Sequence, residues 1–305
     1  SASRIMSQIE FDLAMDDLRL PFRTAAEYHR SALNEPDSSS ARRRELLPLV
    51  RLAAPLAAVH LGDQLLGLVD TAVVGRVGAA ELGAVGLGGA VFFLVSVVGI
   101  GVLIGLDPLI SQAHGAGEEV RARRLVWQGL WLSLLVSAPI ALVVVLACLA
   151  LPALGIAQGT ADLCLHYVLS RLPGLYPMIA FTAMRAYLQS HGTTRPLLTG
   201  AIVANVANAP LSWLLVLGDA GLLRAGLPAI GVPALGVVGA GLVSSLASWI
   251  KLAWGAHAVF RIASPEDDQR HRPDPRALRE ILGVGLPVGL HLGAEVGGFA
   301  LVTFF

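Results

Sequence analysis

The chain has 305 residues, of which 55% are hydrophobic and only 14% are charged, and its mean hydropathy is +0.68. A soluble domain of this size has about 25% charged residues, so the composition indicates a polytopic membrane protein. The 22 basic residues balance the 22 acidic ones, and a net charge of zero argues against a nucleic-acid partner.

Residues 1–44 differ in kind from the rest of the chain. The first 40 hold seven acidic and four basic residues and no continuous apolar run, so they are not a secretory signal peptide. The segment ends in the polar run NEPDSSS at 34–40. Because such a composition buries too little apolar surface to fold alone, we expect a disordered cytosolic extension over 1–44.

Seven apolar runs follow, each bounded by Gly, Pro or charged residues and long enough to cross a hydrocarbon core of about 30 Å. They cover residues 46–74, 82–106, 125–149, 163–188, 197–217, 232–260 and 277–305. Helices satisfy their own backbone hydrogen bonds in lipid, and these runs are too long and too uniformly apolar for barrel strands. The predicted fold class is therefore an all-α membrane protein, a polytopic helix bundle.

The distribution of arginine predicts the orientation in the membrane. The connections on one side hold thirteen arginines, which are Arg42, Arg43, Arg44, Arg121, Arg123, Arg124, Arg185, Arg195, Arg261, Arg270, Arg272, Arg276 and Arg279. The alternate connections hold two, Arg76 and Arg224. Because arginine-rich loops stay in the cytoplasm, we expect a multi-pass protein of the plasma or inner membrane with a cytoplasmic amino terminus.

The longest connection suggests how the spans are grouped. Residues 263–276 contain three prolines and four acidic residues, a composition typical of a linker. We therefore expect a six-helix lobe over 45–260, a cytoplasmic linker over 261–276, and at 277–305 the first helix of a second, incomplete lobe. Since the last run reaches the final residue, the chain is interpreted as a fragment of a longer protein or as a half-protein.

Two carboxylates lie inside the first apolar run, LGDQLLGLVDTAVVGRVG at 61–78. With 100° per residue, His60, Asp63, Gly67 and Asp70 form one stripe of a helix. An ionisable group at bilayer depth costs at least about 2.5–3.5 kcal/mol and usually faces a bundle interior or a water-filled cavity. We predict that Asp70 is functional and that His60, Asp63 and Gln64 line a cavity. The alternative is a structural Asp70 that caps a helix or marks the membrane interface.

Motifs of soluble and membrane enzymes are missing from the sequence. It has no HExxH, GxSxG or phosphate-binding loop, and its adjacent aspartates lie outside the apolar runs. Cys148 and Cys164 form no CxxC or Cys/His cluster and are expected to be packing residues. His166, His191 and His291 show no metal-ligand spacing. We expect neither an enzyme nor a metal site, and no cofactor beyond a coupling ion.

Five motifs in order carry a resemblance to a known family. They are LVDTAVVGRVG at 68–78, SQAHGAG at 111–117, RAYLQSHGTTRP at 185–196, ANVANAPLSWLLVLG at 204–218 and GVVGAGLVSSLASW at 236–249. Together they make the sequence similar to the multidrug and toxic compound extrusion (MATE) transporters. The resemblance implies twelve helices in two six-helix lobes around a central cavity, of which this chain would hold the amino-terminal lobe and the first helix of the second.

The resemblance also implies a function and a set of residues. MATE transporters export drugs or other amphipathic, often cationic, small molecules in exchange for protons or sodium ions. Asp70, Asn208 and Glu295 correspond to residues implicated in cation or proton coupling. Ser212 stands where several members carry an Asp, which weakens the case for a full sodium site, and is a further candidate cavity residue. The full-length protein is expected to be a monomer in the lipid bilayer.

Two alternatives stay open at this stage. A lipid-linked precursor flippase of the same superfamily is expected to have a more basic cavity than the intramembrane Arg51, Arg171 and Lys251 supply. A non-transporting membrane scaffold follows if the chain is a true half-protein.

Arg171 is expected to pair with a carboxylate.

Overall fold

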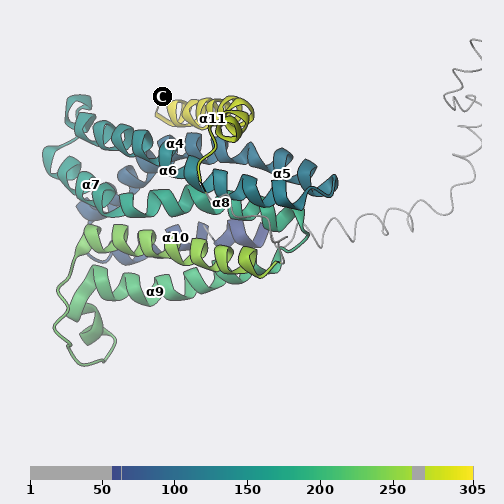
Figure 1. The fold of residues 1–305 in the computed structure, drawn as a ribbon. Helices are drawn as coiled ribbons and strands as arrows, with labels where there is room; N and C mark the ends of the chain where they lie inside the picture. The colour runs from purple at the N-terminus through teal and green to yellow at the C-terminus, as the bar shows by residue number, and fades with distance from the viewer. Residues whose placement is uncertain (1–56, 63, 263–271, 305) are drawn as a thin grey trace, which may run out of the picture. The chain divides into compact units, whose positions relative to one another are not determined.

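The computed structural model describes residues 57–62, 64–262 and 272–304, and within these ranges every regular element is helical (Figure 1). The first described helix covers 57–62 and 64–74. It is followed by α4 (Ala79–Ile104), α5 (Leu106–Gly115), α6 (Glu119–Ala150), the 3-10 turn η1 (Leu151–Leu154), α7 (Gln158–Arg171), the 3-10 turn η2 (Leu172–Gly174), α8 (Leu175–Ser190), α9 (Arg195–Arg224), α10 (Gly236–Arg261) and α11 (Pro275–Phe304). The predicted extension over 1–44 lies outside the described residues.

Six of these helical stretches are long and apolar enough to cross a membrane, which confirms a multi-pass all-α protein. They are Ala57–Val74, Ala79–Gly115, Glu119–Leu154, Arg195–Arg224, Gly236–Arg261 and Pro275–Phe299. The prediction of one continuous helix over 163–188 is wrong, because α7 ends at Arg171 and α8 begins at Leu175. Pro173 lies in the turn between them and has no N–H, so one α-helical hydrogen bond is missing at this point.

A second break lies in α9, at Gly218 rather than at Pro210. Gly218 has φ 58°, and a Cβ at this position would lie 2.5 Å from the backbone nitrogen of Ala234. The Asp219 carboxylate then accepts the backbone N–H groups of Ile230, Gly231 and Val232 at 3.0–3.1 Å. This glycine and this carboxylate hold the loop before α10 against the end of α9.

The helices pack around one continuous apolar core. Within it α4 and α6 pack on each other and on α7 and α8, and α10 packs on α7, α8 and α9 (Figure 1). Phe92 and Tyr187 are among the largest fully buried side chains. Cys148 and Cys164 are free and buried, with their sulfur atoms 3.8 Å apart, in agreement with the expected packing role.

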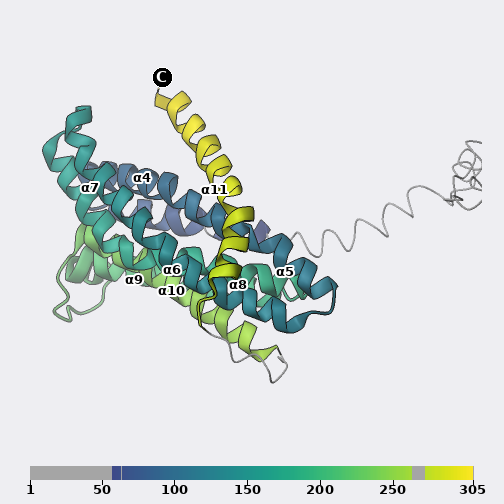
Figure 2. The same ribbon diagram turned by 45° about the horizontal axis from the view of Figure 1, so that its top comes forward.

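Helix α11 crosses the other helices obliquely and packs mainly on α4 (Figure 2). Glycines make this crossing possible. A Cβ on Gly101 would lie 2.5 Å from Cα of Gly289, and one on Gly105 would lie 2.5 Å from Cα of Gly285. Small residues at this spacing allow two backbones to touch, as is common between membrane helices.

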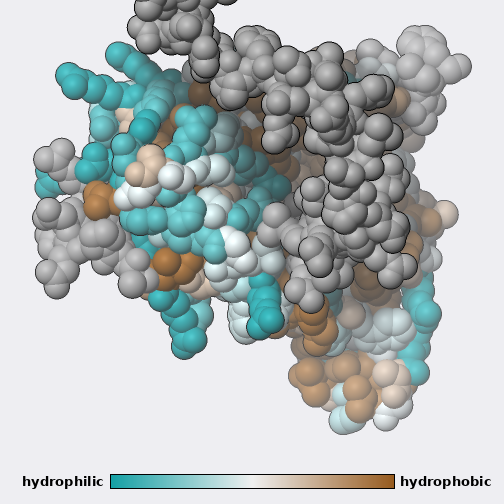
Figure 3. Space-filling model, turned by 90° about the vertical axis from the view of Figure 1, so that its right-hand side faces the viewer, coloured by the Kyte–Doolittle hydropathy of each residue, from teal (hydrophilic) through white to brown (hydrophobic). Residues whose placement is uncertain are grey.

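The end of the bundle where α5 meets α6 differs from the helix sides. Hydrophilic side chains gather on this end (Figure 3), whereas α6 exposes leucines along its length, including Leu135, Leu142 and Leu149. Exposed leucines suit contact with lipid tails, and a polar end suits contact with water.

Candidate functional site

Asp70 is buried at the contact of three helices, with only 5% of its surface exposed. Three side chains donate hydrogen bonds to its carboxylate. Asn208 Nδ2 and Ser212 Oγ, both from α9, lie 2.9 and 2.5 Å from Oδ1. Ser244 Oγ, from α10, lies 2.8 Å from Oδ2. We refer to Asp70, Asn208, Ser212 and Ser244 as the Asp70 cluster.

The Asp70 cluster suits an ionised carboxylate, which can only accept hydrogen bonds. Hydrogen bonds to a charged group contribute about 1.5–3 kcal/mol each, so three of them offset much of the cost of burying the charge. One acceptor is left over, because Asn208 Oδ1 is buried and has no partner among the described residues.

Local packing explains why these side chains meet. Asn208 and Ser212 are four residues apart on α9 and therefore share one face of that helix. Helix α10 can approach α9 closely because residue 239 is a glycine. A Cβ at Gly239 would lie only 2.6 Å from the Leu215 carbonyl oxygen of α9. The small residues at this contact bring Ser244 within hydrogen-bonding distance of a carboxylate on the first helix.

Some of the predicted site residues lie in the Asp70 cluster and others lie elsewhere. Asp70 and Asn208 lie in contact, and Ser212 is fully buried in the same cluster, where its hydroxyl points at Asp70. Ser244 is not among the site residues predicted from the sequence. Its signal is weak, since it is one of two adjacent serines in the apolar run GLVSSLASW.

A cavity of about 620 Å³ lies beside the first helix, and His60 and Gln64 are among the residues that line it. Asp63 lies outside the described residues. His60 and Asp70 do not share one environment, because ten residues at 100° each leave their side chains about 80° apart around the helix. His60 therefore faces the cavity while Asp70 faces α9 and α10.

The same cavity holds polar groups that are not among the predicted site residues. Arg185 and Lys251 line it, together with apolar residues such as Phe181 and Met178. Arg185 Nη2 lies 3.3 Å from Asp107 Oδ2 on α5. The other oxygen, Asp107 Oδ1, is buried without a partner among the described residues. Asp107 and Arg185 are far apart in the sequence, so no spacing pattern points to this pair.

Glu295 lies away from the Asp70 cluster. It is exposed on α11, a helix that packs on α4, whereas the Asp70 cluster is built by the first helix, α9 and α10. Among the described residues its carboxylate has no hydrogen-bond or ion-pair partner. Its assignment to a coupling role therefore stays a prediction from the resemblance.

Arg171 does not pair with a carboxylate within the described part of the chain, so that expectation is wrong there. Its guanidinium donates to the Tyr167 hydroxyl and lies 4.6 Å from the ring centroid of Phe92. The charge is held by an aromatic ring instead, a contact worth about 0.5–2 kcal/mol.

An all-helical bundle with a hydrogen-bonded carboxylate in its core defines a multi-pass membrane protein with an intramembrane ionisable site. The sequence model of the family MatE matches residues 55–214. That match covers more than half of the chain, and the chain belongs to the MatE family.

Relatives agree with this assignment. The chain is 30% identical over 265 residues to a protein of Synechococcus sp. and 34% identical over 262 residues to one of Deinococcus radiodurans, both named "Probable multidrug resistance protein NorM". These matches cover 86% and 85% of this chain but 55% of each relative. The chain thus spans about half the length of these relatives.

A solved structure shows the same fold. The crystal structure of the eukaryotic MATE transporter AtDTX14 matches with a TM-score of 0.71 over 85% of this chain and 55% of that one. Sequence identity is only 18%, so this likeness supports the fold and nothing finer.

Proposed function

We propose that the complete protein is a secondary active antiporter of the cell membrane that exports drugs or other amphipathic, cationic small molecules in exchange for protons or sodium ions. In this proposal Asp70 binds the coupling ion and Asn208 assists it. The observation that carries the proposal is a carboxylate buried between three helices and held by three hydrogen-bond donors.

Binding of an ion at Asp70 would change what holds these helices together. While Asp70 is ionised, its two oxygens receive hydrogen bonds from both α9 and α10. A proton on one oxygen, or a sodium ion beside it, would change which of these hydrogen bonds the carboxylate accepts. An ion that binds one arrangement of the helices better than another shifts the population toward that arrangement. This is how ion entry would drive a change in access to the cavity.

The rest of the proposal is supported by the cavity and the relatives. The cavity beside His60 and Gln64 has mostly apolar walls, which suits an amphipathic compound. Relatives covering this chain are named for multidrug resistance. A cytoplasmic amino terminus and a monomeric state belong to the proposal as well.

A second candidate is a flippase for lipid-linked precursors. It is favoured by Arg185 and Lys251, which place two cationic side chains on the cavity wall and would suit the phosphate of such a lipid. The ion pair of Arg185 with Asp107 weakens this case because it neutralises one of the two charges.

Substitution of Asp70 by Asn tests the proposed coupling. The change keeps the size of the side chain and removes its charge, so substrate-dependent proton or sodium movement should fall by at least about tenfold. The measurement is ion and substrate flux in proteoliposomes that hold the complete gene product, with drug cations and lipid-linked phosphates compared as substrates.

The matched control is Asp162→Asn, which removes an exposed carboxylate on α7. It should leave coupled flux unchanged. Equal expression with undiminished coupled flux in the Asp70→Asn protein would contradict the assignment of Asp70.

A further inference from the structure

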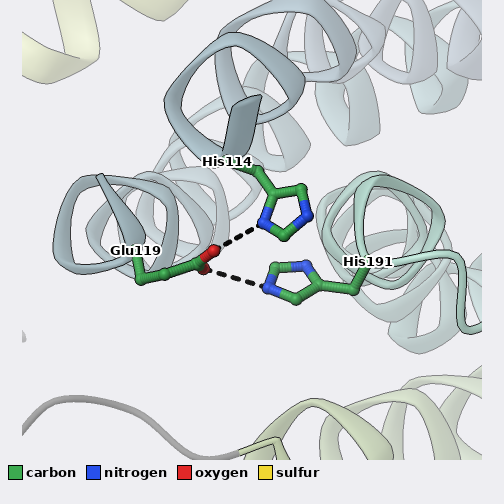
Figure 4. A group of neighbouring side chains, drawn as sticks. All are labelled: His114, Glu119 and His191. Carbon is green, nitrogen blue, oxygen red and sulfur yellow. Dashed lines mark hydrogen bonds and ion pairs between the residues drawn. The ribbon is translucent and has the colours of Figure 1, made fainter. Parts of the chain in front are cut away.

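Three potential metal ligands converge at the polar end of the bundle (Figure 4). His114 lies in the last turn of α5, Glu119 is the first residue of α6, and His191 follows the last residue of α8. His114 Nδ1 lies 2.6 Å from Glu119 Oε1, and His191 Nε2 lies 3.0 Å from Glu119 Oε2. One ligand atom from each residue lies within 4.8 Å of the other two.

The hydrogen bonds of His191 leave a place for a positive charge. His191 Nδ1 lies 2.9 Å from the Tyr187 carbonyl oxygen and 3.1 Å from the Ser190 hydroxyl, and Nδ1 carries the proton when it donates to that carbonyl. In a neutral imidazole Nε2 then presents a lone pair to the Glu119 carboxylate. Two acceptors 3.0 Å apart repel each other unless a second proton or a cation lies between them. The Tyr187 carbonyl thus orients the His191 ring. In metal sites, a carbonyl or carboxylate commonly accepts a hydrogen bond from the second ring nitrogen of a bound histidine in the same way.

The surroundings favour a cation. The carboxyl-terminal ends of α5 and α8 carry the negative ends of their helix dipoles to the two histidines. Side-chain exposure is 35% for His114, 36% for Glu119 and 12% for His191, so an ion can enter and keep water as a further ligand. Arg121, in the same turn as Glu119, is engaged by Glu118 and Glu280 instead.

We propose that His114, Glu119 and His191 bind a divalent first-row transition-metal ion, with Zn²⁺ as the ion tested. Two imidazole nitrogens and one carboxylate oxygen form a donor set that binds such ions in preference to magnesium or calcium. Tetrahedral zinc with ligands at about 2.0–2.2 Å needs ligand atoms about 3.4 Å apart, so each atom would move by about an ångström or less.

The bound ion would tie the α5–α6 turn to the end of α8. Glu119 lies two residues before Arg121, whose guanidinium lies 2.9 Å from the Glu280 carboxylate of α11. The first turn of α6 therefore carries both the metal ligand and the contact to α11. Metal binding at this turn would stiffen the part of the lobe that meets the next helical unit.

The test uses the 305-residue chain, purified in detergent without a polyhistidine tag and freed of metal by a chelator. Zn²⁺ titration by calorimetry should show one saturable site per chain and a rise in melting temperature. Co²⁺ in place of Zn²⁺ should give the visible d–d absorption bands of a four-coordinate site.

Variants locate the site. Glu119→Gln and His191→Gln should each weaken Zn²⁺ binding by at least about tenfold. His166→Gln, which removes an exposed histidine of α7, should leave binding unchanged. The proposal is overturned if the parent chain shows no saturable binding, or if all three variants bind Zn²⁺ equally well.

Discussion

At the residue scale, the neutral side chain of Ser212 leaves Asp70 as the one carboxylate of the Asp70 cluster. Its hydroxyl is fully buried and lies 2.5 Å from Asp70 Oδ1, so an aspartate at this position would bring two carboxylates together away from water. A buried charge without a partner costs about 3–5 kcal/mol. A sodium ion between the two carboxylates would supply the missing partner.

We therefore predict that Ser212→Asp lowers the free energy of unfolding by about 3 kcal/mol or more in potassium buffer. Sodium should restore part of this loss, because a ligand at about 100 times its Kd stabilises a protein by about 2.7 kcal/mol. Melting temperature in detergent, measured in sodium and in potassium salts, checks the prediction.

Ser212→Asn is the control, because it changes the shape of the side chain in a similar way without adding charge. Its melting temperature should not depend on sodium. A Ser212→Asp protein with the same melting temperature in both salts would contradict the prediction that a sodium ion binds between carboxylates at these two positions.

Residues of the Asp70 cluster are only partly predictable from the sequence. Asp70 stands out because a carboxylate in an apolar run is costly, and Asn208 comes from the resemblance. Ser244 carries no charge, so a serine inside an apolar helix gives only a weak sequence signal. The pairing of Glu119 with His191 joins residues 72 positions apart, and only the fold brings them together.

At the element scale, the crossing of α4 and α11 depends on glycine. We predict that Gly101→Ala destabilises the chain by about 1–3 kcal/mol, because the new Cβ would lie 2.5 Å from Cα of Gly289 and backbone atoms cannot move aside. Thermal unfolding in detergent measures the loss, and limited proteolysis should show earlier cleavage of α11.

The matched control lies on the same helix. A Cβ on Gly86 would meet no neighbouring atom within 4 Å, so Gly86→Ala should stabilise the chain by about 0.5–1 kcal/mol through its effect on helix propensity. If both variants shift the melting temperature in the same direction, the close contact of α4 and α11 does not contribute as proposed.

Elements are easier to predict than their breaks. Long apolar runs locate six of the seven expected spans, since length and hydropathy suffice for a helix in lipid. Proline is a poor guide, because α6, α9 and α11 continue through Pro139, Pro210 and Pro287. Breaks occur where other contacts support them, as at Gly218, where the Asp219 carboxylate binds the following loop.

At the scale of the whole molecule, the arginine distribution and the fold distinguish the same two ends of the helix bundle. The α5–α6 turn lies at the polar end of the bundle, and the loop between α9 and α10 lies at the opposite end (Figure 1). The division into lobes over 45–260 and 277–305 stays a prediction, because α11 packs directly on α4 and the described residues hold no further helix of a second lobe.

The orientation can be tested with single cysteines at these two ends. Cys148 and Cys164 are buried, so they should react little. Because arginine-rich ends stay in the cytoplasm, Ala229→Cys in the exposed α9–α10 loop should react with a membrane-impermeant maleimide on intact cells, and Ala116→Cys beside α5 should react only after permeabilisation. The reverse pattern would place the arginine-rich end outside. It would then overturn the predicted orientation.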